Sequence, residues 1–196
     1  MRWCSRSVCS WAERFQAIFG SPIVVSRVLR GAENDADGMS TATFTLLFTD
    51  IAASTEHALR LGDAQWDALL TDYRATVRNE LRHYGGQEVD SAGDGFFAIF
   101  PKTRDAVRCA RSLSSRVDRL GLSSRTGLHS GCCQTGGEKV SGIAVHVAAR
   151  VMACARPGEV LVSEAVYDRM PHTGVINTGA HTLKGLPGEW ALYRVA

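Results

Sequence analysis

The order of strand-like and helix-like segments constrains the fold of this chain more than any single motif does. Residues 43–48 are β-branched and apolar, which predicts a strand, whereas residues 65–84 carry apolar side chains at three- and four-residue steps, which predicts a helix. Two short apolar runs around the turn-forming segment 91–95 predict a hairpin. In chain order, the pattern predicts a strand at 43–48, a helix at 65–84, hairpin strands at 87–90 and 96–100, a helix at 104–120 and a strand at 124–131.

This strand–helix–hairpin–helix–strand order is that of a ferredoxin-like βαββαβ sandwich, an α+β fold that hosts many functions. The pattern further predicts helices at 142–155 and 164–170, a strand at 160–163 and two or three strands in 175–195. The 196 residues suffice for one domain, which we place at 42–196. Residues 1–41 are predicted to be an N-terminal extension and linker; alternatively, Met39 is the true start.

Composition favours a soluble cytoplasmic protein without a nucleic-acid or membrane partner. The formal net charge of +2 is too small to argue for binding to a polyanion. The longest candidate segment falls well short of the ~20 apolar residues that a membrane-spanning helix needs. The six cysteines include no C-x-x-C pair, so we expect reduced thiols rather than a zinc site or a disulfide framework.

Two aspartates follow predicted strands at positions where they can meet. Asp50 ends the first strand, and Asp94 lies in the tight turn of the hairpin, which neighbours that strand in a ferredoxin-like sheet. Two carboxylates and the backbone carbonyl of Ile51 offer the hard oxygen ligands that Mg²⁺ or Mn²⁺ prefers. Spacing alone favours a simpler interpretation, in which Asp50 caps a helix and Asp94 serves only the turn.

Four motifs occur in order along the chain. They are Phe48-Thr-Asp-Ile-Ala-Ala-Ser-Thr55, Gly85-Gly-Gln-Glu-Val-Asp-Ser-Ala-Gly-Asp-Gly-Phe96, Gly142-Ile-Ala-Val-His-Val-Ala-Ala-Arg150 and Leu183-Lys-Gly185. Together they closely resemble the class III adenylate/guanylate cyclase catalytic domain, particularly its bacterial branch, over about four-fifths of the chain. The resemblance implies an adenylate cyclase, a phosphorus–oxygen lyase that converts ATP to 3′,5′-cyclic AMP and pyrophosphate for intracellular signalling.

The resemblance also implies where metal ions and a second protomer enter the site. Asp50, Asp94 and the Ile51 carbonyl match the family's ligands for two Mg²⁺ or Mn²⁺ ions, which activate the ribose 3′-hydroxyl and neutralise the triphosphate. Family members build each site across a two-fold interface. A homodimer is therefore implied, in which one protomer supplies these ligands and its partner supplies the remaining residues.

Three further residues have a family role and a simpler explanation. Arg150 matches the transition-state arginine of the family, and His146, one helical turn earlier, takes the place of an asparagine that orients the ribose or the transition state. Lys184 matches a lysine that contacts the terminal phosphates. Without the resemblance, the three would be a solvated helix arginine, a surface histidine and a surface lysine.

The residues for base recognition depart from the family pattern. Adenylate cyclases of this family place a lysine and an aspartate or threonine around the purine, whereas here Asp90 takes the lysine position and Lys139 the aspartate position, with Glu138 as an alternative match. An exchanged pair can still satisfy adenine, or it can misplace the nucleotide. The alternatives are a GTP-using cyclase and a degenerate cyclase domain that serves as a nucleotide-binding or dimerising regulatory module.

Overall fold

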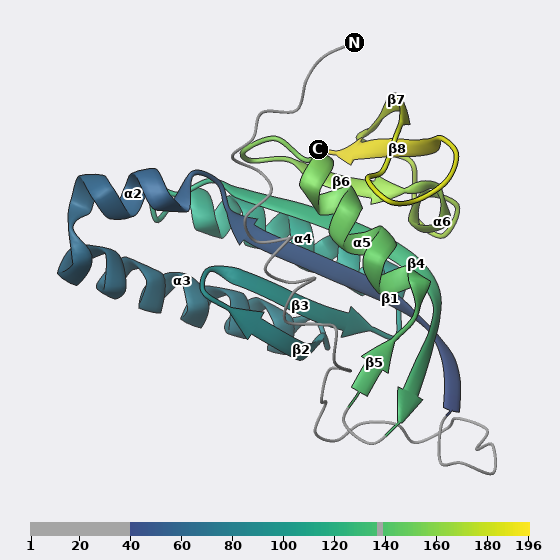
Figure 1. Cartoon of the computed structure of the whole chain (residues 1–196), viewed down its shortest axis with the longest axis horizontal. Coiled ribbons are helices and arrows are strands. Elements are labelled where there is room, and N and C mark those ends of the chain that lie inside the picture. Colours follow the sequence, from purple (N-terminus) through teal and green to yellow (C-terminus); the bar gives the residue numbers. More distant parts are fainter. Residues whose placement is uncertain (1–39, 137–138) are drawn as a thin grey trace.

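One sheet of eight strands runs through the part of the chain that the structure describes, residues 40–136 and 139–196 of a computed structural model (Figure 1). Its strands are β1 (Ser40–Ile51), β2 (Gln87–Ala92), β3 (Gly95–Phe100), β4 (Ser124–Gly136), β5 (Lys139–Ser141), β6 (Val160–Ser163), β7 (Val175–His181) and β8 (Trp190–Val195). The helices are α2 (Ser54–Leu61), α3 (Asp63–His83), α4 (Thr103–Asp118), α5 (Ile143–Cys154) and α6 (Glu164–Tyr167).

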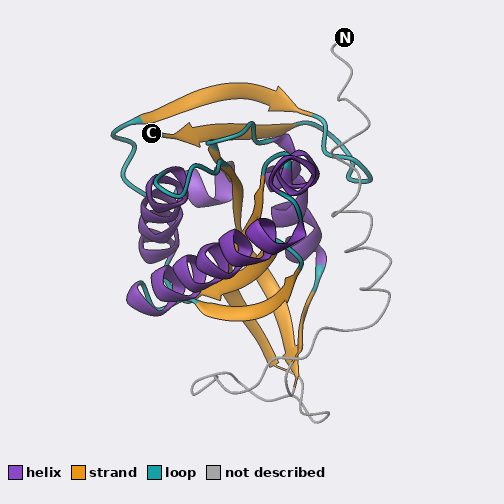
Figure 2. Cartoon of the chain, turned by 90° about the vertical axis from the view of Figure 1, so that its left-hand side faces the viewer, coloured by secondary structure: helices purple, strands orange, loops and turns teal. Residues whose placement is uncertain are grey.

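The strand order of the sheet is β2-β3-β1-β4-β6-β8-β7, with β5 paired to β4. The central strand β1 is antiparallel to both β3 and β4, whereas β4 and β6 are parallel. The segment from β1 through α3, β2, β3 and α4 to β4 is therefore the strand–helix–hairpin–helix–strand unit that the sequence predicts, and the α+β fold is confirmed. The antiparallel strands β8 and β7 form the edge of the sheet beyond β6, at the top of the view in Figure 2.

Helices cover both faces of the sheet because the side chains of β1 alternate between them. Leu47 and Ile51 lie in one core with buried residues of α3 and α4, whereas Leu46 and Phe48 lie in another with buried residues of α5. Residues 44–52 are all buried, as expected of a central strand with both faces covered. By the same alternation, Asp50 belongs to the α5 side of the sheet.

Two glycines of β4 allow α5 to approach the sheet closely. A Cβ at Gly127 would lie 2.1 Å from the backbone nitrogen of Met152, and a Cβ at Gly131 would lie 2.8 Å from the Cβ of Ala144. Both glycines therefore leave space that the α5 backbone and its small side chains occupy. Their spacing along β4 fixes α5 lengthwise on the sheet, and with it the positions of every side chain on α5.

Some expectations from the sequence fall outside the described residues. These include the structure of the N-terminal extension, the alternative start at Met39 and the residue Glu138. In residues 40–136 and 139–196, no helix is long and apolar enough to cross a membrane. The cysteines of this part, Cys109, Cys132, Cys133 and Cys154, are thiols and do not form disulfides with one another.

Candidate functional site

Asp50 is a buried carboxylate at the end of β1. The residue is 2% exposed, and its neighbour across the strand pair is Arg125 of β4. Burial raises the pKa of Asp50 from 3.8 to about 6; the Arg125 guanidinium opposes this shift, and the charge of Asp94 adds to it. A carboxylate held in such an environment is poorly compensated, and a nearby cation would stabilise its ionised form.

Arg125 is the immediate partner of Asp50, and the sequence analysis missed it. Its Nε donates to Oδ1 of Asp50 at 2.9 Å and its Nη2 donates to Oδ2 at 2.6 Å, a bidentate geometry. The side chain of Arg125 is only 16% exposed. The signal available in the sequence was a charged residue inside a strand of small and apolar side chains. Its partner depends on the β1–β4 register, which local pattern does not show.

Asp94 reaches the same place from the β2–β3 hairpin. Gly93 and Asp94 form a two-residue turn between paired Ala92 and Gly95, and Gly93 has the positive φ of 62° that favours glycine. The backbone N–H of Ile51 donates to Oδ2 of Asp94 at 3.2 Å. The structure thus brings the Asp94 carboxylate to the end of β1, beside Asp50.

Tyr73 of α3 lies at the buried side of this junction. Burial raises the pKa of its hydroxyl well above 10, and the charges of Asp94 and then Asp50 raise it further. The tyrosine therefore stays neutral and closes the site toward the core. On the other side of Ile51, Ala53 has a left-handed φ of 56°, the one positive φ at a non-glycine residue within the described ranges.

The donors present at this junction fit a hard divalent cation. Two carboxylates and the backbone oxygen of Ile51 are the ligand types that Mg²⁺ and Mn²⁺ prefer. Across residues 40–136 and 139–196 no group of three His, Cys, Asp or Glu side chains could hold a metal ion. A cation bound at this junction would need further oxygen ligands, of the kind that water or a phosphate offers. The bidentate guanidinium of Arg125 already provides positive charge at the Asp50 oxygens.

The second group of predicted residues lies on the outer side of α5. His146 is exposed, Arg150 is half-buried, and Ile143 is 64% exposed, whereas the residues between them are buried against the sheet. These three positions are spaced by three and four residues, so they share one helix face. The face points away from the sheet that carries Asp50.

The remaining predicted residues are placed only in part. Asp90 is half-buried in β2, where its Oδ1 accepts a hydrogen bond from the N–H of Ser91 at 2.8 Å. Lys139 begins β5, and its backbone pairs with Gly136, but its side chain lies outside the described part of the structure. Lys184 is exposed and follows buried Leu183 in the connection from β7 to β8.

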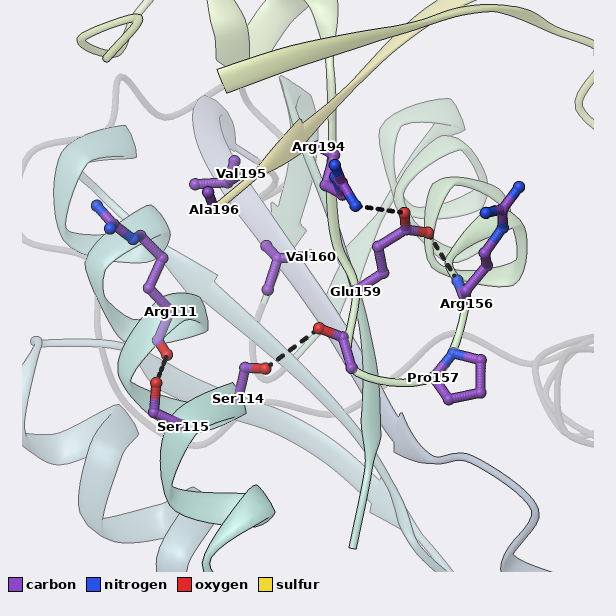
Figure 3. Close-up of a pocket in the computed structure, with 11 residues that line it drawn as sticks. Arg111, Ser114, Ser115, Arg156, Pro157, Glu159, Val160, Arg194, Val195 and Ala196 are labelled. Carbon is purple, nitrogen blue, oxygen red and sulfur yellow. Dashed lines mark hydrogen bonds and ion pairs between the residues drawn. The ribbon is translucent and has the colours of Figure 1, made fainter. Parts of the chain in front are cut away.

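A cavity of about 530 Å³ lies elsewhere, lined by α4 and by the ends of β6 and β8. Three arginines line it, but they do not converge on one point. Arg194 lies 4.0 Å from Glu159, and Figure 3 shows the guanidinium groups of Arg111 and Arg156 pointing away from each other. The cavity contains none of the residues singled out from the sequence, and we assign it no role.

The chain is similar to known proteins in both sequence and fold. The family model of the adenylate and guanylate cyclase catalytic domain matches residues 38–195. An uncharacterized protein of Mycobacterium tuberculosis is 31% identical over 160 residues, which cover 78% of this chain and 55% of that protein. The chain thus spans about half the length of this relative.

Solved structures of the same class share the fold. The adenylyl cyclase CyaB from P. aeruginosa matches with a TM-score of 0.76 at 21% identity, over 81% of this chain and 95% of that chain. The guanylyl cyclase Cya2 matches with a TM-score of 0.72 at 20% identity, over 81% and 94%. These likenesses show the fold and do not select a base. The chain belongs to the family of adenylate and guanylate cyclase catalytic domains.

Proposed function

We propose that this cyclase domain converts ATP to 3′,5′-cyclic AMP and pyrophosphate at a site completed by a second copy of the chain. The observation that carries the proposal is the meeting of Asp50 and Asp94 at the end of β1, with Oδ2 of Asp94 bonded to the Ile51 N–H. Two carboxylates at the end of a central strand, next to a glycine-rich turn, leave room for a phosphate to approach the backbone closely.

The carboxylates are proposed to hold two divalent cations, Mg²⁺ or Mn²⁺. When bound, these ions would favour the ionised ribose 3′-hydroxyl and neutralise charge on the triphosphate. Burial of Asp50 suits this role, because Arg125 compensates its charge only in part and a cation would add to that compensation. Arg125, which engages both Asp50 oxygens here, would offer its fork of donors to phosphate oxygens if a cation occupied the carboxylate instead.

The outward face of α5 supports a shared site. His146 and Arg150 lie on the side of α5 that faces away from the sheet of their own protomer, together with exposed Ile143. An apolar side chain beside two polar ones is a surface that a second copy can cover. In the proposed dimer, Arg150 stabilises charge on the α-phosphate, His146 donates a hydrogen bond to the nucleotide, and Lys184 binds the terminal phosphates.

Adenine is the proposed base, and Asp90 is proposed to recognise it by hydrogen bonding. A carboxylate accepts hydrogen bonds, so Asp90 suits the exocyclic amino group of adenine, while the ammonium of Lys139 would donate to a ring nitrogen. This assignment reverses the positions that the family resemblance implies. It supports a second candidate function: a domain that binds nucleotide with little catalysis and regulates a partner by dimerisation.

Cyclic AMP formation by the purified full chain tests the proposal. Wild type with Mn²⁺ and ATP is expected to form cyclic AMP, and Asp94→Asn is expected to abolish it. The matched control is Asp118→Asn, which changes an exposed carboxylate at the end of α4 and should retain activity. GTP in place of ATP separates the two substrates. Nucleotide binding without product from ATP or GTP, in a folded dimer, would favour the regulatory module.

A further inference from the structure

The turn that carries Asp94 is held from two sides. The N–H of Ile51 binds its carboxylate at 3.2 Å, as described above. From the other side, Arg74 of α3 donates two hydrogen bonds to the carbonyl oxygen of Gly93, from Nε at 3.1 Å and from Nη2 at 2.8 Å. Because the peptide group is planar, fixing the Gly93 carbonyl also fixes the nitrogen and Cα of Asp94.

Tyr73, the residue before Arg74, positions Arg74 over the Gly93–Asp94 turn. Tyr73 is fully buried and packs edge-on against the ring of Phe96, with centroids 6.0 Å apart and an interplanar angle of 66°. Phe96 is the second residue of β3, directly after the turn. The Tyr73–Phe96 contact therefore holds this part of α3 against the hairpin, and the side chain of the next residue reaches the Gly93 carbonyl.

We propose that Arg74 is a positioning residue of the metal site, whose two hydrogen bonds keep the Gly93–Asp94 turn aligned with Asp50. The inference rests on the proposed function, in which Asp94 binds a divalent cation. A carboxylate on a two-residue turn has little backbone support of its own, and Gly93 at φ 62° is the most permissive residue of that turn. Loss of a group that orients a metal ligand typically weakens metal binding or activity by about 10- to 100-fold.

The neighbouring Arg78 provides a matched control. It lies one helical turn after Arg74, donates to both carboxylate oxygens of Glu88 at 2.9 Å, and stands 5.4 Å from the centroid of the Phe96 ring. Arg78 thus docks α3 on the same hairpin through β2, at Glu88 and, from Nη2, at Oγ of Ser91 at 3.4 Å, whereas Arg74 binds the Gly93 carbonyl of the turn. Arg78→Ala should loosen the docking and leave the alignment of Asp94 intact.

Two measurements on the full chain test the inference. The first is amide hydrogen exchange of residues 91–96 in the metal-free protein. The second is the affinity for Mn²⁺ in the presence of 2′,3′-dideoxy-ATP, which lacks the attacking hydroxyl, read by the paramagnetic resonance signal of free Mn²⁺. Arg74→Ala is expected to speed exchange in the turn and to weaken Mn²⁺ binding at least about tenfold. Arg74→Lys, which keeps a donor but loses the fork, should fall between, and Arg78→Ala should stay within twofold of wild type.

The outcomes separate this inference from the proposed function. Mn²⁺ binding by Arg74→Ala within twofold of wild type would overturn the inference, as would an equal loss in Arg78→Ala, which would reduce Arg74 to one of several docking contacts. Equal Mn²⁺ affinities of wild type and Asp94→Asn would also overturn the inference, because Asp94 would then not be a metal ligand. If wild type binds Mn²⁺ through Asp94 but forms no cyclic nucleotide, the proposed function fails and the role of Arg74 is still decided by the Mn²⁺ affinities.

Discussion

The guanidinium of Arg125 engages both carboxylate oxygens of Asp50, yet burial still holds the pKa of Asp50 near 6. The ion pair therefore does not fully offset the removal of the carboxylate from water. A buried, incompletely compensated charge at the end of a central strand lowers the stability of the fold. Such a cost is common at sites where a bound ion or substrate later supplies the missing interaction.

The pH dependence of stability should reveal the buried carboxylate. Because the folded-state pKa of Asp50 is above its unfolded value of 3.8, the folded chain holds the extra proton between about pH 4 and 6. Stability from this group therefore rises as the pH falls through that window, on the order of 3 kcal/mol for a shift of about two units. Asp50→Asn removes the titration. Urea titrations in the presence of a chelator give the free energy of unfolding of wild type and of Asp50→Asn. We expect the difference, wild type minus variant, to increase by that amount as the pH is lowered from 7 to 4. A difference that does not change with pH would contradict this prediction.

His129 should have the opposite effect in the same pH range. It is a buried residue of β4 whose Nδ1 lies 2.8 Å from Oγ of Ser163, and burial, followed by the charge of Arg169, lowers its pKa from 6.5 to about 4. In the unfolded chain His129 is protonated below about pH 6.5, whereas in the folded chain it is protonated only below about pH 4. Stability from His129 is therefore lost as the pH falls, again on the order of 3 kcal/mol.

His129→Asn isolates this second contribution, since asparagine keeps a polar atom near the position of Nδ1 but does not titrate. The wild-type minus variant free energy of unfolding should fall between pH 6.5 and 4, opposite in sign to the Asp50→Asn series. The two effects oppose each other in wild type, so a flat wild-type profile is compatible with both. Parallel wild-type and His129→Asn profiles would show that His129 titrates normally.

Close packing of α5 on β4 predicts a graded cost at two glycines. In Gly131→Ala the new Cβ lies 2.8 Å from the Cβ of Ala144, and relief requires about 1–3 kcal/mol of rearrangement. Ala144→Gly should recover part of that loss, although glycine in a helix itself costs about 1 kcal/mol. In Gly127→Ala the new Cβ meets backbone atoms of Met152, so the loss should be larger and no side-chain truncation on α5 should relieve it.

A double-mutant cycle of Gly131→Ala and Ala144→Gly, followed by urea unfolding, measures this coupling. Additive losses would mean that α5 has moved away from the sheet instead of resisting the new methyl group. Cyclase activity of the same variants gives a second readout, because α5 carries His146 and Arg150.

The sequence predicted the order of the elements because apolar periodicity is a local signal, and it underestimated the lengths of the paired strands. Local pattern placed the first strand at 43–48, whereas β1 begins at Ser40 and pairs with β4 up to Thr135. Most of the additional residues are polar, and cross-strand pairing supports them: the hydroxyls of Ser40 and Thr135 lie 2.8 Å apart. Such long-range pairing leaves no period-two signal in the chain.

The candidate site was predictable to the same degree. Asp50 and Asp94 were candidates because each lies at the end of a predicted strand, but spacing alone favoured a helix cap and a turn residue, and only the family resemblance implied a metal site. Arg125 and Arg74 could not be found, since the first depends on the β1–β4 register and the second on how far along the hairpin α3 is docked. Both partners act on the aspartates from elements distant in sequence, and the docking that brings them there is set by the packed core.

Mixing two inactive variants should restore activity if the site is shared between protomers. Asp50→Ala would remove a residue of the sheet side, and Arg150→Ala a residue of the outer α5 face, so each homodimer would lack one residue in both of its sites. A mixed dimer regains one site with both residues and one site lacking both. Random association yields mixed dimers as half the population, so refolding the two variants together should recover about a quarter of wild-type cyclic AMP formation by symmetry. The control is Asp50→Ala mixed with Asp94→Ala, which places both losses on the sheet side and should stay inactive. Recovery in neither mixture would indicate that Asp50 and Arg150 act within one protomer.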